Sequence, residues 1–270
     1  MEDIRFLKTR TKQAIKVKFK RVAQSVGYDI VKYHDYAPGS APTYPNDFTP
    51  HHVSIINQVR PYTLTSPASL YSLTEAVSHI VRRNIAGSIV ECGVWRGGSM
   101  MAAALTLANL NSQDRDLYLF DTYEGMTKPQ AVDIHFTGNS AIAEFEQLQT
   151  GEDRSAVCYA SLGDVKAAMA LTKYNPNRLH YIKGKVEDTI PSQAPERIAL
   201  LRLDTDWYES TRHELEQLFP RLSPGGILII DDYGAWQGAR KATDEYLAKH
   251  APGLFLNRVD DTVRLAVKNC

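Results

Sequence analysis

Five short apolar segments alternate with longer segments of helical apolar spacing, and this alternation constrains the fold most. The five segments are 88–92, 117–121, 179–183, 198–203 and 227–230. Buried strands of a parallel sheet have apolar runs of this length, and regular strand–helix alternation places helices on both faces of the sheet. The sequence therefore predicts an α/β fold with a mostly parallel sheet. Segments 254–259 and 262–267 predict a C-terminal antiparallel hairpin that completes seven strands.

Helical spacing predicts five helices along the same part of the chain. They lie at 69–83, 98–110, near 189, 210–222 and 235–250. Ser66 and Pro67 precede the first of them, which is typical of a helix start. The polar stretch 122–172 is too long for a simple connection, so we expect it to contain one or two helices and a mobile lid.

The first 45 residues differ in composition from the rest. Residues 4–26 carry apolar side chains at helical spacing among lysines and arginines, which predicts a basic amphipathic helix. Residues 36–50 contain four prolines, which is typical of an irregular connector. We therefore predict an extension over 1–45 and the main domain over 46–270. The helix can make peripheral contact with a membrane or an anionic partner, but packing against the domain or a second subunit is favoured, which predicts a homo-oligomer.

The charge balance and the cysteines narrow the function further. The 31 basic residues equal the 31 acidic residues, so no overall field favours nucleic acid. No run approaches the roughly 18 apolar residues of a transmembrane helix. Cys92, Cys158 and Cys270 lack the spacing of a zinc or redox motif and fit a reducing compartment. Because no secretory apolar segment follows Met1, we expect a cytoplasmic protein.

Four aspartates follow the last two predicted parallel strands. Asp204 and Asp206 come after 198–203, and Asp231 and Asp232 come after 227–230. Ligands of open α/β sheets bind beyond the carboxyl ends of the strands, so these side chains are expected to converge on one cleft. Clustered carboxylates are unfavourable unless a cation or proton neutralises them, and Mg²⁺ prefers oxygen ligands. The sequence therefore predicts a divalent metal site.

A glycine-containing turn follows the first strand, where a doubly wound fold binds the nucleoside end of a cofactor. Its glycines are at positions 93, 97 and 98. This spacing does not match GxGxxG, and Trp95 and Arg96 would obstruct a pyrophosphate, so an NAD-dependent oxidoreductase is disfavoured. Glu91, shortly before the first glycine, suits a cofactor with an ammonium group, such as S-adenosylmethionine.

Two other strand ends suit the nucleoside of such a cofactor. Asp121 ends the second strand, where a carboxylate can accept hydrogen bonds from two ribose hydroxyls; its alternative role is a helix cap or a surface carboxylate. Residues 184–188 follow the third strand and are placed to meet an adenine ring. Asp188 and Thr189 fit a simple helix cap equally well.

Five segments together resemble one family of enzymes. They are RPYTLTSP at 60–67, VECGVWRGGS at 90–99, FDTYEGM at 120–126, LDTDWY at 203–208 and IDDYG at 230–234. In this order they resemble the macrocin O-methyltransferase family, which uses S-adenosylmethionine and magnesium to methylate sugar hydroxyls in antibiotic biosynthesis. The resemblance covers residues 50–270, and several motifs in order are more specific than a single glycine turn.

The resemblance implies a class I S-adenosylmethionine-dependent methyltransferase domain with a Rossmann-like sheet. Residues that would bind the methionine end of the cofactor are Thr63, Leu64 and Ser69 above it, and Glu91, Gly93, Trp95 and Ser99 in the turn below. Asp121 would bind the ribose, and Val186 and Glu187 would flank the adenine. Asp204, Asp231 and Asp232 match the magnesium ligands. Asp206 matches a proposed general base.

The acceptor and the base leave alternatives open. Related metal-dependent enzymes that methylate catechols use a lysine where this chain has Thr205, Asp206 and Trp207, which argues against a phenol and for a glycoside acceptor. An aspartate with the ordinary pKa of about 3.9 is a weak base toward an alcohol, so Asp206 depends on the metal for this role. Alternatively it orients a ligand or caps a helix, and His135 is another candidate base. The competing functions are methylation of a non-sugar hydroxyl and a non-catalytic binding or assembly role.

Overall fold

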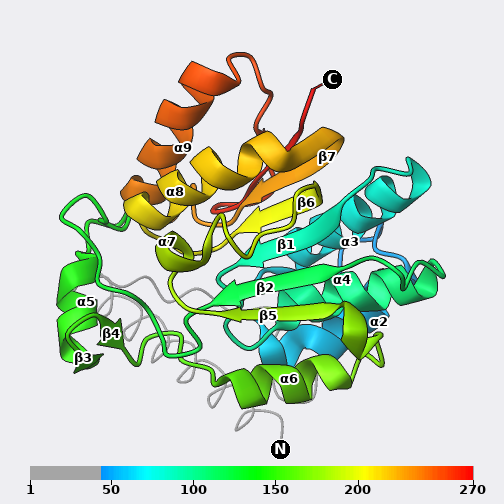
Figure 1. The fold of residues 1–270 in the computed structure, drawn as a ribbon, viewed down its shortest axis with the longest axis horizontal. Coiled ribbons are helices and arrows are strands. Elements are labelled where there is room, and N and C mark those ends of the chain that lie inside the picture. The colour runs from blue at the N-terminus through cyan, green and yellow to red at the C-terminus, as the bar shows by residue number, and fades with distance from the viewer. Residues whose placement is uncertain (1–43, 270) are drawn as a thin grey trace, which may run out of the picture. The chain divides into compact units, whose positions relative to one another are not determined.

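The computed structural model describes residues 44–269, which build a seven-stranded sheet between two layers of helices (Figure 1). The strand order is β5-β2-β1-β6-β7-β9-β8. The parallel strands are β1 (Ser88–Cys92), β2 (Leu117–Asp121), β5 (Leu179–Lys183), β6 (Ile198–Leu203) and β7 (Leu222–Ile230). The antiparallel strands are β8 (Asn257–Arg258) and β9 (Arg264–Val267). The predicted sheet and hairpin are thus confirmed, whereas the helix predicted at 4–26 lies outside the described residues.

The sheet explains why its central strands have apolar sequences. Every residue of β1 and β6 is buried, because these strands are covered on both faces. β1 pairs with β2 on one side and with β6 on the other, so the strand order changes direction at this point. Ligands of doubly wound folds bind at such a switch point, beyond the carboxyl ends of the strands.

The helices divide between the two faces of the sheet (Figure 1). On one side lie α2 (Pro50–Val59), α3 (Pro67–Arg82), α4 (Gly98–Asn109) and α6 (Leu162–Ala170); on the other lie α7 (Val186–Thr189), α8 (Tyr208–Leu218) and α9 (Gln237–His250). Helix α2 was not predicted, because it begins at a proline that was assigned to the connector. Thr49 caps it, accepting a hydrogen bond from the His52 backbone while the His52 ring bonds the Thr49 amide. This is a capping box with histidine in place of the usual glutamate.

The segment between α8 and β7 differs from the prediction. Helix α8 ends at Leu218, the short 3₁₀ helix η3 (Phe219–Arg221) follows, and β7 begins at Leu222 instead of residue 227. Pro220 ends the regular helix because it cannot donate a backbone hydrogen bond. The pairing of β7 with β6 begins at Ile198 and then shifts register, which accommodates the glycines at 225 and 226.

The long insertion after β2 contains more structure than a loop. It comprises α5 (Ala141–Gln147), a hairpin of β3 (Gln149–Gly151) and β4 (Arg154–Ser155), and then α6. Figure 1 shows α5 and the hairpin beyond the tips of the sheet strands. The Phe136 amide donates to the Ala235 carbonyl at 3.0 Å, and the Gln237 amide donates to the Ile134 carbonyl at 2.9 Å. The insertion is therefore attached to the segment that precedes α9.

None of the helices that the structure describes combines the length and the apolar character needed to cross a membrane.

Candidate active site

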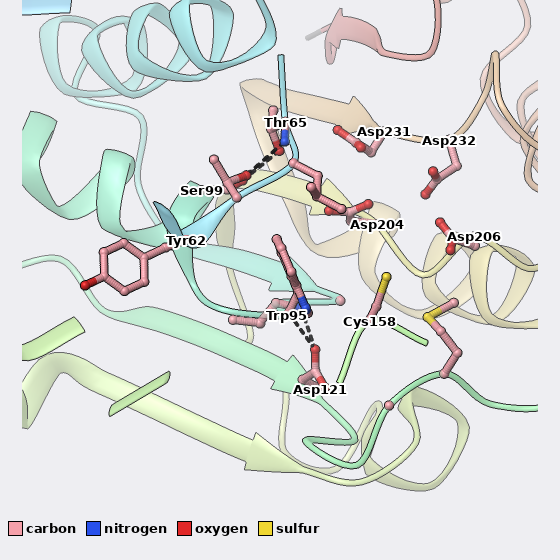
Figure 2. Close-up of a pocket in the computed structure, with 16 residues that line it drawn as sticks. Tyr62, Thr65, Trp95, Ser99, Asp121, Cys158, Asp204, Asp206, Asp231 and Asp232 are labelled. Atoms are coloured by element: carbon pink, nitrogen blue, oxygen red, sulfur yellow. Dashed lines mark hydrogen bonds between the residues drawn. The ribbon is translucent and has the colours of Figure 1, made fainter. Parts of the chain in front are cut away.

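The four predicted aspartates lie together at the carboxyl ends of β6 and β7 (Figure 2). Single carboxylate oxygens of Asp204, Asp206 and Asp232 lie within 4.8 Å of one another. Asp231 lies beside them, but its Oδ1 accepts a hydrogen bond from Arg202. The structure therefore brings all four predicted residues to one cavity, with three carboxylates in the tightest group. We call these four aspartates the aspartate cluster.

A strained turn positions Asp206 within the cluster. Its φ of 66° lies in the left-handed region, which non-glycine residues adopt only with an energetic cost. The Trp207 amide donates to the Thr205 carbonyl at 2.7 Å, which closes the turn. Thr205 is held in turn by the buried Glu214 of α8, whose Oε1 accepts its hydroxyl hydrogen bond at 3.0 Å. These contacts aim the Asp206 carboxyl group at Asp232, as Figure 2 shows.

Arg202 lies beneath the cluster and was not predicted as a site residue. Its side chain is 3 % exposed, and its guanidinium nitrogens lie 2.7 Å from Glu91, 2.5 Å from Asp204 and 2.6 Å from Asp231. The sequence signal was a single arginine within the otherwise apolar run of β6. A charge at a fully buried strand position needs partners of opposite charge, and here three carboxylates supply them.

The site carries an excess of negative charge. Glu91 and the four aspartates are five carboxyl groups beside one guanidinium. Burial raises the pKa values of Asp206, Asp231 and Asp232 well above the ordinary value, and neighbouring carboxylates raise them further. The buried Oδ2 of Asp232 has no hydrogen-bond partner among the described residues. The cluster is therefore electrostatically incomplete without protons or a cation.

The cluster opens into a cavity of about 250 Å³ at the switch point of the sheet. Residues from the predicted cofactor set that line it are Thr63, Leu64, Gly93, Trp95, Ser99 and Asp121. Tyr62, Thr65, Met126 and Cys158 also line it and were not predicted. Met126 and Cys158 come from the insertion, where the sequence carries no periodic signal. The Thr65 and Ser99 hydroxyls lie 3.3 Å apart and join the wall of the cavity to the start of α4.

Asp121 shapes the glycine-containing turn. Its Oδ2 accepts hydrogen bonds from the amides of Val94 and Trp95 at 2.7 and 2.9 Å, and its Oδ1 accepts one from the Tyr123 amide at 2.6 Å. Burial raises the pKa of Asp121, whereas these amides oppose the rise. Oδ2 already accepts two hydrogen bonds, whereas Oδ1 accepts one short bond and a 3.5 Å contact from the Thr122 hydroxyl, so Oδ1 is the oxygen with capacity for a ribose hydroxyl.

The turn and the aspartate cluster meet at Gly93. A Cβ atom at this position would overlap the carbonyl oxygen of Asp204, and the φ of Gly93 is 82°. The Asp204 amide donates to the Cys92 carbonyl at 2.9 Å, which holds the two segments in contact. Only glycine satisfies both the backbone conformation and the close approach.

A smaller adjoining cavity of about 60 Å³ lies beyond β2 and β5. Val186 and Glu187 line it together with Phe120 and Asp121. This is where the two predicted adenine contacts lie. Asp188 and Thr189 belong to the short helix α7.

Three predicted residues have contacts outside the cavity lining. Glu91 is 1 % exposed and bonded to Arg202. The Ser69 hydroxyl donates to Asp260 at 2.6 Å, alongside Ser66 at 2.5 Å. His135 lies in the insertion. Its ring and the Trp236 ring meet edge to face with centroids 5.2 Å apart, and its Nδ1 lies 2.7 Å from the Thr137 hydroxyl. Their cofactor and base roles remain predictions.

A third cavity of about 150 Å³ lies on the other side of Asp206. Trp207 and Trp236 form part of its wall and meet edge to face, with ring centroids 5.0 Å apart. The nearby tyrosines Tyr208 and Tyr233 instead bond the α9 carboxylates of Glu245 and Asp244. Phe145 of α5 also lines the cavity, so the insertion contributes to the space beside the aspartate cluster.

The strand order, the cavity at the switch point and the acidic strand ends define a class I S-adenosylmethionine-dependent methyltransferase. The family model described as macrocin-O-methyltransferase (TylF) matches residues 53–265. The chain belongs to this family and is an O-methyltransferase, as the sequence motifs predicted.

Named relatives and solved structures agree with this assignment. An 8-demethyl-8-(2,3-dimethoxy-alpha-L-rhamnosyl)-tetracenomycin-C 4'-O-methyltransferase of Streptomyces olivaceus is 31% identical over 201 residues, covering 74% of this chain and 73% of that protein. A mycinamicin III 3''-O-methyltransferase of Micromonospora griseorubida is 31% identical over 189 residues, covering 70% and 71%. The structure of the O-methyltransferase NovP is 25% identical with a TM-score of 0.68, covering 77% and 83%.

Proposed function

We propose that the protein transfers a methyl group from S-adenosylmethionine to a hydroxyl of a sugar in a glycosylated small molecule, in a reaction that depends on a divalent metal. The observation that carries the proposal is the shared cavity, because the aspartate cluster lines the same space as the cofactor turn. The Streptomyces olivaceus relative is named for a rhamnosyl-bearing compound, which supports a sugar acceptor.

The residues of the cluster fit a magnesium ion. All four side chains offer carboxylate oxygens, the ligand type that Mg²⁺ prefers. The oxygens of the tightest group lie within 4.8 Å, close to the roughly 4 Å between opposite ligands of an octahedral magnesium ion. The buried Oδ2 of Asp232, which has no partner among the described residues, fits a ligand role. Mg²⁺ held there would supply Lewis acidity that lowers the pKa of a coordinated hydroxyl.

We assign Asp204, Asp231 and Asp232 to the metal and Asp206 to the acceptor hydroxyl. Asp206 would accept the proton that the hydroxyl loses as the new C–O bond forms and the sulfonium C–S bond breaks. Without a cation in the cluster, burial raises the pKa of Asp206 above its ordinary value, and its place beside the ligand carboxylates would put it next to a coordinated hydroxyl. The turn that holds Asp206 also fixes its direction, which favours the in-line geometry of methyl transfer.

A second assignment has support in the geometry. Asp204, Asp206 and Asp232 form the tightest group, and Asp231 is bonded to Arg202. In this alternative Asp206 is a metal ligand and Asp231 positions Arg202. Asp206→Asn and Asp231→Asn separate the two assignments by Mn²⁺ binding, measured by electron paramagnetic resonance. If Asp206 is the base, Asp206→Asn keeps Mn²⁺ affinity within about threefold and lowers kcat by about a hundredfold or more. If Asp206 is a ligand, this variant loses Mn²⁺ binding.

The cofactor would lie along the cavities described above. Asp121 would accept hydrogen bonds from the ribose, and Val186 and Glu187 would flank the adenine. Thr63, Leu64, Gly93 and Ser99 would surround the methionine end. Glu91 would act indirectly, by holding Arg202 behind this end of the cavity, because its carboxyl group is enclosed and bonded to Arg202.

Methyl transfer to paired acceptors tests the function. Purified protein with S-adenosylmethionine, Mg²⁺ and aryl rhamnosides should release S-adenosylhomocysteine, and EDTA or Asp204→Asn should abolish the release. Activity that survives both treatments would contradict metal dependence. Phenols and non-glycosylated polyketides form the comparison panel, and turnover confined to them would contradict the sugar acceptor.

A further inference from the structure

Arg202 places a positive charge next to the aspartate cluster even when no metal is bound. It extends from β6, is 3 % exposed, and forms ion pairs with Glu91 of β1, with Asp204 after β6 and with Asp231 after β7. Its Nη2 also donates to the Thr65 hydroxyl at 3.2 Å. One side chain therefore joins three neighbouring strands and the wall of the cofactor cavity.

The shape of a guanidinium makes these contacts interdependent. Its nitrogens lie in one plane and donate in fixed directions, whereas an ammonium group is a point charge that can rotate. Nη1 bonds Glu91 and Asp204, and Nη2 bonds Asp231 and Thr65. The separation of the Asp204 and Asp231 carboxylates is thus set by the width of the guanidinium. Without it, like charges at two strand ends would move apart.

Burial makes the arrangement stiff. Glu91 is 1 % exposed, and its Oε1 is held by Arg202. The pairing outweighs the burial of Arg202 itself: burial lowers its pKa, but Asp204, Asp231 and Glu91 raise it further, so the group stays charged. A buried ion pair resists rearrangement, because moving either partner exposes an unpaired charge.

We propose that Arg202 is a positioning residue that sets the spacing of Asp204 and Asp231, so that a divalent cation meets ligands already in place. The inference rests on the proposed function, since it assumes that these aspartates bind the metal. The positioning role can be distinguished from a role in which Arg202 only balances the negative charge. A residue that only balances charge can be replaced by lysine, whereas a residue that sets a distance between two carboxylates cannot.

Mn²⁺ binding to the purified full-length protein, followed by electron paramagnetic resonance, tests the inference without turnover. Arg202→Lys keeps the positive charge but removes the planar guanidinium with its two donor nitrogens. It should weaken Mn²⁺ binding by about tenfold or more. S-Adenosylmethionine affinity, measured by calorimetry, should change by less than about threefold in this variant. The hydrogen bond to Thr65 is the contact of Arg202 with the far wall of the cofactor cavity, and its loss has a small effect. Arg212→Lys on α8 is the matched control, because that arginine pairs with Glu209 and Glu216 at the surface.

A second variant guards against misfolding. Arg202→Met combined with Glu91→Met removes both members of the buried pair and replaces them by apolar side chains, which buried sites often tolerate. Weakened Mn²⁺ binding in this folded double variant would support the positioning role. Wild-type Mn²⁺ affinity in it, or in Arg202→Lys, would overturn that role while leaving the proposed function intact. A wild-type protein that binds no Mn²⁺ would contradict the proposed metal site, and the inference with it.

Discussion

Glu214 accepts a hydrogen bond from Thr205 at 3.0 Å, and Thr205 is the residue between the two aspartates that follow β6. Both Glu214 oxygens are enclosed, and Oε2 has no partner among the described residues. Burial raises the pKa of Glu214 well above the ordinary value, so the group can carry a proton and remain neutral. The contact links the body of α8 to the turn that aims Asp206.

Thr205→Val should impair catalysis although it hardly changes the size of the side chain. It keeps the shape but leaves the Glu214 Oε1 without its partner, which costs about 1–3 kcal/mol of unfolding free energy. With the turn released, kcat should fall by about tenfold. Denaturant unfolding and initial rates check both effects. Thr243→Val in α9 is the control, because that buried hydroxyl donates to the Ala239 carbonyl one turn earlier in its own helix, and the kcat of this variant should remain at the wild-type level.

Asp121→Asn should weaken cofactor binding selectively. The amide has one acceptor oxygen in place of two. The variant therefore loses either the hydrogen bonds from Val94 and Trp95 or the one from Tyr123, together with the predicted ribose contact. We expect the KM for S-adenosylmethionine to rise by about tenfold or more, with the acceptor KM nearly unchanged. Steady-state kinetics with each substrate varied in turn measure the two values. An equal rise in both would argue against a cofactor-specific role.

Asp260→Ala should loosen the segment that covers the cofactor cavity. Asp260 accepts hydrogen bonds from Ser66 and Ser69 at the start of α3, and from the Thr262 and Val263 amides. Burial raises its pKa, but these bonds outweigh burial and lower it, so its stabilising effect is present at neutral pH and is lost on acidification. We expect a loss of about 1–3 kcal/mol in unfolding free energy and a higher KM for S-adenosylmethionine.

The neighbouring Asp261 provides the control for this change. Its side chain is 96 % exposed and pairs with Arg258 at the surface. Asp261→Ala should therefore leave stability within about 0.5 kcal/mol of the wild type. Equal losses in the two variants would mean that the hairpin turn, and not the contact with α3, is what matters.

The metal-free protein should become less stable as the pH rises. Burial raises the pKa of Glu91 from 4.5 to about 8, although Arg202 opposes the rise. The folded state therefore holds a proton that the unfolded chain has released, so this contribution is complete below about pH 4.5 and is lost as the pH rises through about 8. The raised pKa values of Asp206, Asp231 and Asp232 act in the same direction.

Thermal melts in EDTA check this sign. The Tm should fall between about pH 5 and pH 8, and added Mg²⁺ should restore it at the upper end, where the ligands are ionised. Glu91→Gln should flatten part of the fall, because it removes one of the titrating groups. A Tm that rises over this range would contradict the assignment of raised pKa values.

Strand positions could be predicted because burial on both faces leaves a direct mark on sequence. β1, β2, β5 and β6 have the predicted bounds. The meeting of Asp204 with Asp232 followed from the same logic, since parallel strands end at one edge. Helix α2 was missed because its first residue, Pro50, was assigned to the proline-containing connector, and β7 was predicted too short because proline and glycine near its start interrupt an apolar run.

Side-chain partners across the sheet could not be read from the chain. Arg202 was visible only as an interruption of an apolar strand, and its partners depend on register: Glu91 lies opposite Arg202 in the pairing of β1 with β6. Cys158 and Met126 reach the cavity from an irregular insertion, where no periodicity indicates direction. The contact of Ser69 with Asp260 joins residues 191 positions apart, which local patterns do not encode.

Gly93 couples the cofactor turn to the aspartate cluster, because its backbone lies against that of Asp204. A larger residue there would displace the backbone of Asp204, so a change made to alter cofactor choice would also disturb the acidic strand end. Engineering that aims at a new methyl donor therefore has to start on the far wall, at the 78 % exposed Leu64, because the neighbouring Thr65 bonds Arg202 and is linked through it to the aspartates.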